Sequence, residues 1–344
     1  MKRLAAALSA LVVFTAQAPA HGGTGAHGRR DPQQLDFSKV EIRTTKVAGG
    51  VYMLEGAGGN IGVSAGADGV LIVDDQFSPL ADKVRAAFKP LSPGPLRFVL
   101  NTHFHFDHTH ANPVFGREAT IVAHANVRRR LSVETLVLGE TYKPQPKEGL
   151  PVVTYETTVS VYFNGEEVRV VHFPSGHTDG DSVVFFTASN VIHMGDDFFA
   201  GRFPFVDVEN GGSVEGLERN VSEIIEKAPA DVKIIPGHGP LSTLADLRAY
   251  RDVLRETIAL VRARVSAGRT LEQAKAEGLP DKFREWGSGF INTGDWIELV
   301  YKSLKKNAGS KAHFPRDTRD ASARLSCLGG RVTDLHDLAE SLHY

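Results

Sequence analysis

The stretch NTHFHFDHTHAN, residues 101–112, places four histidines and one aspartate within eight consecutive positions. It directly follows an apolar segment at 97–100 that is typical of a buried strand. Alternate side chains of an extended chain point to the same side, so His103 and His105 are expected to form a chelating pair. Asp107 and His108 then lie at the first turn beyond it. Imidazoles together with a carboxylate suit zinc, and iron or manganese are also feasible ions.

Three more turns of the same kind follow predicted strands further along the chain. PSGHTDGD follows a strand at 168–173, HMGDD follows one at 190–194, and PGHG follows one at 232–235. In open α/β arrangements such strand ends face one crevice, where ligands collect. The sequence therefore predicts that these histidine- and aspartate-bearing turns meet the cluster of residues 101–112.

The residues of these turns resemble the metallo-β-lactamase superfamily. Its mark is H-x-H-x-D-H, followed downstream by a His, then an Asp or Cys, and then a last His. The matching positions in this chain are His103, His105, Asp107, His108, His177, Asp196 and His238. The resemblance covers roughly residues 40–240. It implies an α/β fold, namely a four-layer αββα sandwich, here with a C-terminal helical extension.

The resemblance also implies how the seven positions divide between two metal ions, with zinc as the expected metal at two per chain. The first ligand set would be His103, His105 and His177. The second ligand set would be Asp107, His108 and His238. Asp196 would bridge the two ions, which would activate a water molecule for attack on a carbonyl group. Asp107 would be the catalytic residue that orients this water and returns a proton to the leaving group.

The most favoured function is an exported dimetal hydrolase that acts on a small molecule, either an ester, a lactone, a thioester or an amide, β-lactams included. Zinc β-lactamases with Cys at the bridging position keep a Lys three residues later, where this chain has Phe199. The segments GHTDGDS and MGDD, with a bridging Asp, are closer to the glyoxalase II-like branch, although no basic cluster for glutathione is identified. Candidate substrate contacts are His110, Phe199 and Arg202.

Two further functions remain open at this point. A persulfide dioxygenase with a single iron would use a subset of the same ligands, and a non-catalytic metal-binding protein could keep the same fold. Metal identity separates the dioxygenase from the hydrolase. A nucleic-acid partner is not expected, because the formal net charge is −2 and no basic stripe is present.

The first twenty residues, MKRLAAALSALVVFTAQAPA, are typical of a secretory signal peptide. A basic start precedes a short apolar run and a small-residue site, which predicts cleavage after Ala20 and a periplasmic or secreted protein. An uncleaved anchor is the alternative. No later segment is long and apolar enough to cross a membrane. Cys327 is the sole cysteine, so no internal disulfide is expected.

The rest of the chain divides by composition and periodicity, within a total of 344 residues. Residues 21–39 are rich in glycine and predict a flexible leader, and 40–242 form the predicted catalytic domain. Apolar positions at helical spacing predict C-terminal helices within 243–307 that pack on this domain. Residues 308–344 show no sustained period and predict a loosely ordered tail.

Overall fold

Two β-sheets stacked face to face form the centre of the protein in this computed structural model, which describes residues 35–312. The predicted signal peptide, most of the leader and nearly all of the tail lie outside the described residues. The larger sheet contains, in spatial order, β1 (Arg43–Ala48), β2 (Val51–Glu55), β3 (Ile61–Gly66), β4 (Gly69–Val73), β5 (Leu96–Asn101), β6 (Thr120–His124) and β9 (Val153–Tyr155). The smaller one contains β10 (Thr158–Phe163), β11 (Glu166–His172), β12 (Ser182–Phe186), β13 (Val191–His193), β14 (Lys233–Ile235) and β15 (Ser242–Thr243).

Strand β4 explains why the sheets stack and why helices cover their outer faces. All five of its residues, GVLIV, are buried, because successive side chains point to opposite faces and both faces are covered. Leu71 and Val73 join the apolar layer between the two sheets. Val70 and Ile72 point the other way and pack with Val84 of helix α1 (Ala81–Phe88). Burying both faces of this sheet therefore takes helices on one side and the second sheet on the other, and the second sheet has its own layer of helices.

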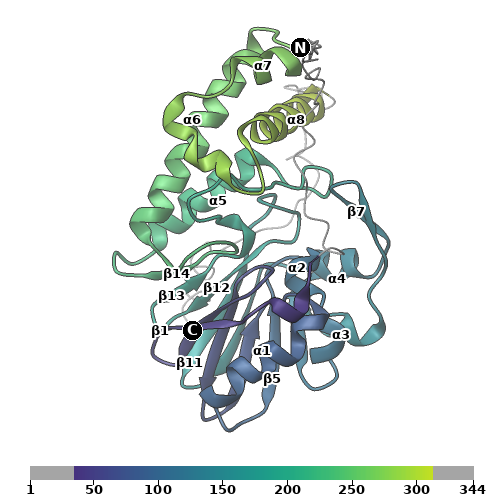
Figure 1. The fold of residues 1–344 in the computed structure, drawn as a ribbon, viewed down its shortest axis with the longest axis vertical. Coiled ribbons are helices and arrows are strands. Elements are labelled where there is room, and N and C mark those ends of the chain that lie inside the picture. The colour runs from purple at the N-terminus through teal and green to yellow at the C-terminus, as the bar shows by residue number, and fades with distance from the viewer. Residues whose placement is uncertain (1–34, 313–344) are drawn as a thin grey trace, which may run out of the picture. The chain divides into compact units, whose positions relative to one another are not determined.

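Helices cover the outer face of each sheet (Figure 1). The larger sheet is covered by α1 and by the short helix α3 (Asn112–Phe115). The smaller sheet is covered by α5 (Val214–Lys227) and α6 (Leu244–Ser266), which bury Leu217, Val221 and Leu254 against it. The predicted four-layer αββα sandwich is confirmed.

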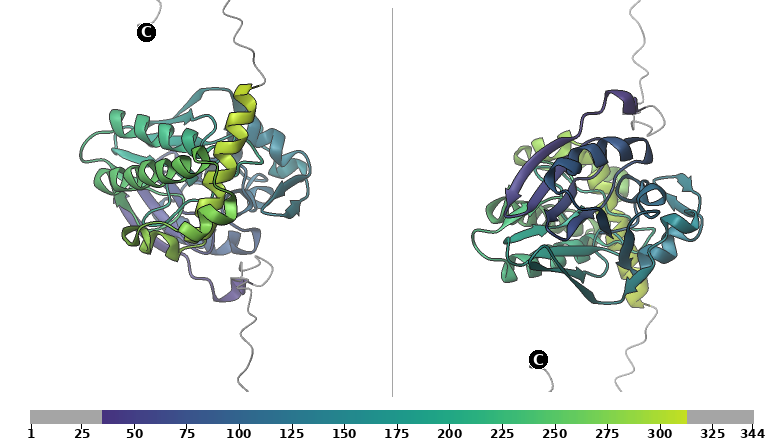
Figure 2. Two further views of the ribbon diagram at one scale, coloured as in Figure 1. Left: turned by 90° about the horizontal axis from the view of Figure 1, so that it is seen from above. Right: turned by 90° about the horizontal axis from the view of Figure 1, so that it is seen from below.

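The C-terminal helices include α6, α7 (Leu271–Glu277) and α8 (Thr293–Ala312), and α8 lies across α5 and α6 (Figure 2). Trp296 anchors α8, because it is fully buried and its ring stacks on Phe203 at 5.4 Å. Helix α8 continues past the predicted end of the helical region at residue 307. Asn307 donates hydrogen bonds to Ser213 and Glu215 at the start of α5, which fixes this last part of α8. Within residues 35–312, no helix has the length and apolarity that a bilayer crossing requires.

One small sheet was not predicted from the sequence. Strands β7 (Thr135–Val137) and β8 (Glu140–Tyr142) form a hairpin that follows helix α4 (Ala125–Leu131). Its turn uses Leu138 and Gly139, both with positive φ. A leucine rarely adopts this conformation, so the hairpin could not be predicted from the residues of its turn.

The strands that precede the candidate ligands end at one edge of each sheet. Strands β4, β5 and β6 run parallel, so their carboxyl ends lie together. In the smaller sheet β13 and β14 are parallel, and β11 has the same direction because it is antiparallel to β12. This arrangement collects the loops after β5, β11, β13 and β14.

Two stacked histidines join the sheets beside this edge. His124 ends β6 and His172 ends β11, and their rings stack at 3.7 Å with planes 10° apart. Burial, followed by the charge of His172, lowers the pKa of His124, while Glu156 and Asp179 oppose this shift. Burial also lowers the pKa of His172. The hydrogen bond to the Asp181 carbonyl and the charges of Asp179 and Glu156 act in the opposite direction.

This pair is expected to make the fold less stable in acid. The pKa of each ring is lowered by folding, so its contribution is full above the unfolded value of about 6.5 and falls as pH drops below that value. The measurement is the free energy of unfolding at pH 7.5 and 5.5 with a chelator present. We expect the wild type to lose more stability than His172→Phe, which keeps a stacked ring without the proton site. Equal losses would contradict the lowered pKa values.

Candidate metal centre

The structure brings all seven sequence-predicted ligand positions together at this edge. His103 and His105 lie in the loop after β5, and Asp107 and His108 lie in the short helix α2 (Phe106–Thr109) that follows it. The other three come from loops or turns after β11, β13 and β14, namely His177, Asp196 and His238. The donor atoms form two groups, and the atoms of each group lie within 4.8 Å of one another. One group is the first ligand set with Asp196, and the other is the second ligand set.

Asp196 lies between the two ligand sets and offers one oxygen to each. Its Oδ2 is 3.5 Å from His177 Nε2 and 3.8 Å from His103 Nε2. Its Oδ1 is 3.1 Å from His108 Nε2 and 3.4 Å from His238 Nε2. A carboxylate in this position can bridge two cations, one per oxygen.

The first ligand set shows imidazoles already oriented to coordinate an ion. His177 Nδ1 lies 2.8 Å from the carbonyl oxygen of Phe205, which can only accept, so this nitrogen carries the hydrogen. His105 Nε2 likewise donates to Asp207 Oδ2 at 3.0 Å. The lone pairs of His177 Nε2 and His105 Nδ1 therefore face each other, 2.8 Å apart. Such outer hydrogen bonds are how proteins fix the tautomer of metal-binding histidines.

The second ligand set is held in the same way through Asp74. His108 Nδ1 donates to Asp74 Oδ2 at 2.8 Å, which leaves Nε2 to face Asp196. The adjacent carboxylates have other partners, because Asp75 accepts from the backbone of Ala111 and Asp197 from the backbone of His177. Asp74 and Asp207 are thus the carboxylates that orient the ligand rings, and neither was identified from the sequence. Asp207 lies far along the chain and carries no local signal.

Two buried atoms at the centre lack a hydrogen-bond partner among residues 35–312. They are His103 Nε2 and Asp196 Oδ1, and both face the space between the ligand sets. A buried polar atom without a partner costs about 1–3 kcal/mol, so its presence here fits a group that coordinates it. Donors of this kind, imidazole nitrogen and carboxylate oxygen, fit a divalent transition metal.

The pKa values of the ligand positions follow from burial and from the carboxylates. Burial lowers the pKa of His103 well below its usual range and that of His177 to about 4, so both rings are neutral at pH 7. Burial opposes charge on His238 too, but Asp196 and its neighbours raise its pKa to about 9. Burial acts against the charge of Asp196, yet His238 and His108 bring its pKa well below the usual range. A divalent cation bound between His238 and Asp196 could take the place of the proton on the imidazole ring.

Glycine backbone lies directly against the ligands on both sides. A Cβ added to Gly59 would lie 2.0 Å from the ring of His108, and the Gly59 N–H donates to the Asp107 carbonyl at 3.2 Å. A Cβ on Gly237 would lie 2.1 Å from Asp196 Oδ1. These two positions exclude any side chain, and they were not identified from the sequence.

The open side of the centre lies at Asp107 and His238. His103, His105, His108, His177 and Asp196 are buried. The side chains of Asp107 and His238 are 32% and 24% exposed, with His238 Nε2 3.3 Å from Asp107 Oδ2. These two are therefore the ligand positions that are most exposed to solvent.

The three predicted substrate contacts lie in different surroundings, and their role stays a prediction. His110 stacks on Phe106 at 3.7 Å, and its Nδ1 accepts a hydrogen bond from the Ser78 backbone. Phe199 is buried and stacks on His238 at 4.9 Å, so it contacts a ligand position. Arg202 is half-buried and makes no hydrogen bond or ion pair within the described part of the chain.

Comparisons with known proteins agree with this geometry. The family model of the metallo-β-lactamase superfamily matches residues 55–265. Among solved structures, the chain is similar to the DIM-1 metallo-β-lactamase, with a TM-score of 0.51 and 18% identity over 63% of this chain and 99% of that one. It is also similar to the metallo-β-lactamase from Pontibacter korlensis, with a TM-score of 0.52 and 16% identity over 62% of this chain and 99% of that one. Likeness at such identities shows the fold.

A curated relative extends the comparison by sequence. A protein of Aquifex aeolicus (strain VF5), described as uncharacterized, is 30% identical over 92 residues. The match spans 27% of this chain and 43% of the length of that protein. The family model covers more than half of the chain, and the fold and the His/Asp cluster agree with it. The chain belongs to the metallo-β-lactamase superfamily.

Proposed function

We propose that the protein is an exported hydrolase with two zinc ions that cleaves a carbonyl compound, either an ester, a lactone, a thioester or an amide, β-lactams included. The observation that carries the proposal is the position of Asp196, whose two oxygens face two separate sets of ligand atoms. Two ligand sets that share one carboxylate are the arrangement expected for two ions. The similar solved structures are metallo-β-lactamases by name, which is why β-lactams belong among the substrates to test.

The residues present would hold one ion at the first ligand set and one at the second, with Asp196 between them. Ions bound there would lower the pKa of a water molecule towards neutrality and stabilise negative charge on the carbonyl oxygen of a substrate. The seven ligand positions are histidines and aspartates, so they offer nitrogen and oxygen donors only. Zinc accepts such a set, as do iron and manganese.

Asp107 is the residue placed to move a proton. Burial opposes its charge, but His108 and His238 lower its pKa to about 2, so it is a carboxylate at neutral pH. Its side chain is 32% exposed and lies at the open side of the centre. From there it can accept a proton from the attacking water and pass it to the leaving group.

Aromatic rings limit the access of water around the first ligand set. Phe205 lies 5.7 Å from the rings of both His105 and His177, and Phe199 lies 6.1 Å from His177. Charges interact more strongly in such surroundings than in water. This favours stabilisation of the charge that develops during carbonyl hydrolysis.

The test is the metal content of the purified protein, measured by elemental analysis, together with hydrolysis of a chromogenic cephalosporin and a simple lactone. We expect about two zinc ions per chain and turnover of at least one substrate, lost on treatment with a chelator and restored by zinc. Asp196→Ala is expected to lose both ions, because each set loses an oxygen ligand. A periplasmic or extracellular location of the protein, checked by cell fractionation, tests export.

Other results would favour the alternatives. A single iron without hydrolysis would contradict the proposal and favour a persulfide dioxygenase. Two bound ions without turnover of any carbonyl substrate would instead favour a non-catalytic metal-binding protein.

A further inference from the structure

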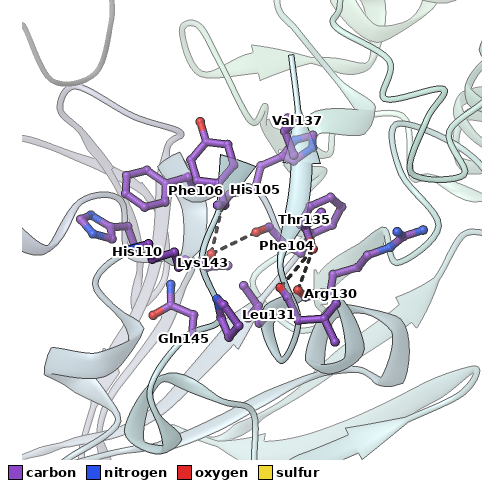
Figure 3. A pocket seen from close by; sticks show the side chains of 14 residues that line it. Phe104, His105, Phe106, His110, Arg130, Leu131, Thr135, Val137, Lys143 and Gln145 are labelled. Carbon is purple, nitrogen blue, oxygen red and sulfur yellow. Dashed lines mark hydrogen bonds between the residues drawn. The ribbon is translucent and has the colours of Figure 1, made fainter. Parts of the chain in front are cut away.

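A cavity of about 230 Å³ lies beside the metal centre, between α2, α4 and the β7–β8 hairpin (Figure 3). Its apolar wall consists of Phe104, Phe106, Leu131, Val133, Val137, Tyr142 and Pro144. An apolar cavity of about 150 Å³ is large enough for benzene. The cavity therefore has room for a group of phenyl size with a short linker.

The cavity adjoins the centre through shared walls. His105, a member of the first ligand set, lines it, and so do Phe106, Thr109 and His110 of the α2 region. Asp107, which comes from the same short helix, faces the second ligand set instead. A molecule held at the open side of the centre has this cavity as its neighbour across α2.

An exposed apolar side chain forms part of the outer wall of the cavity. Val133, which precedes β7, lines the cavity and is 51% exposed. Exposed apolar side chains at a hollow are typical of binding sites in soluble proteins. Tyr142 packs on Phe106 at 5.0 Å and closes the far end of this wall.

Most polar groups of the cavity are already used by the protein. Thr109 Oγ1 donates to the Phe104 carbonyl, and Thr135 Oγ1 donates to the Arg130 carbonyl. The Arg130 guanidinium is held by Asp179 and Asn210, which leaves it no free charge for a ligand.

Two polar side chains of the cavity stay available. Lys143 has no ion pair or hydrogen bond within residues 35–312, and the side-chain amide of Gln145 has none there either. A cation and an amide at the rim of an apolar hollow match an anionic group attached to an apolar one. Gln145 can donate to a carboxylate that Lys143 neutralises.

We propose that this cavity binds the non-reacting part of the substrate, an apolar group of phenyl size that carries a carboxylate, with the carboxylate paired to Lys143. The inference rests on the proposed function and specifies its substrate class: carbonyl compounds with an apolar, anionic side group. Binding in this cavity would hold the substrate next to His105, the member of the first ligand set that lines it.

The first experiment measures binding without any reaction. The probes are 3-phenylpropanoate and 3-phenylpropanamide, titrated by calorimetry into the full chain treated with a chelator. We expect saturable binding with a preference for the carboxylate. Lys143→Gln should reduce that preference about two- to fivefold, the range of an exposed ion pair. Val133→Glu should weaken binding of the carboxylate about tenfold or more, because it puts a charge of the same sign into the apolar wall.

Matched controls come from the same segments. Leu136→Glu places the same charge on the hairpin outside the cavity, and Lys147→Gln removes a nearby exposed cation that does not line it. Both should bind the probes as the wild type does. Absence of saturable binding, or equal effects of the cavity variants and their controls, would overturn the inference.

A second measurement separates the inference from the proposed function. Acid release is followed by titration at constant pH for methyl acetate, methyl 3-phenylpropanoate and the monomethyl ester of phenylsuccinate. A rise in kcat/KM along this series that Lys143→Gln abolishes supports the cavity assignment. Equal hydrolysis of all three overturns it while the hydrolase stands. Probe binding at the cavity, with no hydrolysis of these esters, of the cephalosporin or of the lactone, would overturn the proposed function and leave the binding site in place.

Discussion

Gly59→Ala is expected to remove the ion of the second ligand set and to lower hydrolysis about 100-fold or more. The added methyl group would lie 2.0 Å from the His108 ring, far inside contact distance. His108 has no room to yield, because it is fully buried and its Nδ1 is fixed to Asp74 at 2.8 Å. A displacement of a ligand by about 1 Å is enough for a loss of this size.

The measurement for Gly59→Ala is the zinc content after dialysis, with kcat/KM for whichever carbonyl substrate the wild type turns over. Gly294→Ala is the control, because its added methyl group meets only the ends of Asn292 and Lys275 at 3.3 Å and 3.5 Å. It should keep both ions and full activity. A Gly59→Ala protein with two ions and normal turnover would show that His108 is not a ligand in this position.

Asp74→Asn is expected to weaken metal binding at the second ligand set about 10- to 100-fold, the usual effect of losing an outer partner of a ligand. Three donors converge on the carboxylate: the Thr102 N–H at 2.8 Å, the Thr102 hydroxyl at 2.7 Å and His108 Nδ1 at 2.8 Å. An asparagine has one acceptor oxygen in place of two, so at least one buried donor loses its partner. His108 then loses the contact that fixes its tautomer.

The Asp74→Asn result is read from a metal titration against a competing chelator, which resolves the two binding steps. Asp207→Asn is the matched variant, because Asp207 supports His105 of the first ligand set at 3.0 Å. We expect Asp74→Asn to weaken one step and Asp207→Asn the other. If both variants weakened the same step, the division of the ligands into two sets would be wrong.

The sandwich was expected from the resemblance to a known family, and that resemblance rests on motifs that are local in the sequence. Apolar runs such as GVLIV indicate buried strands, and each ligand-bearing turn directly follows a strand. The short spacing of residues 103–108 makes half of the cluster visible in a single segment. Periodicity also identified α6, whose apolar residues recur at helical spacing.

Contacts between distant segments could not be predicted in the same way. Asp207 reaches His105 across 102 positions, and Gly59 meets His108 only because two loops approach in space. The β7–β8 hairpin turns through Leu138, a residue that rarely adopts positive φ, so its sequence does not indicate a turn. The cavity depends on that hairpin and was hidden for the same reason.

Because the ligands come from two different sheets, metal ions bound at the centre would link one sheet to the other. Four ligand positions follow β5 of the larger sheet, and three follow strands of the smaller sheet, while strand pairing within residues 35–312 stays inside each sheet. Elsewhere the two layers are held by apolar packing of side chains such as Leu71 and Phe186, and by hydrogen bonds such as that from the Tyr155 hydroxyl to Ser182 Oγ at 2.8 Å. Ions shared by both layers would add directional bonds between them, so that the free energy of coordination opposes their separation. Supply of metal would thereby govern how long the protein stays folded.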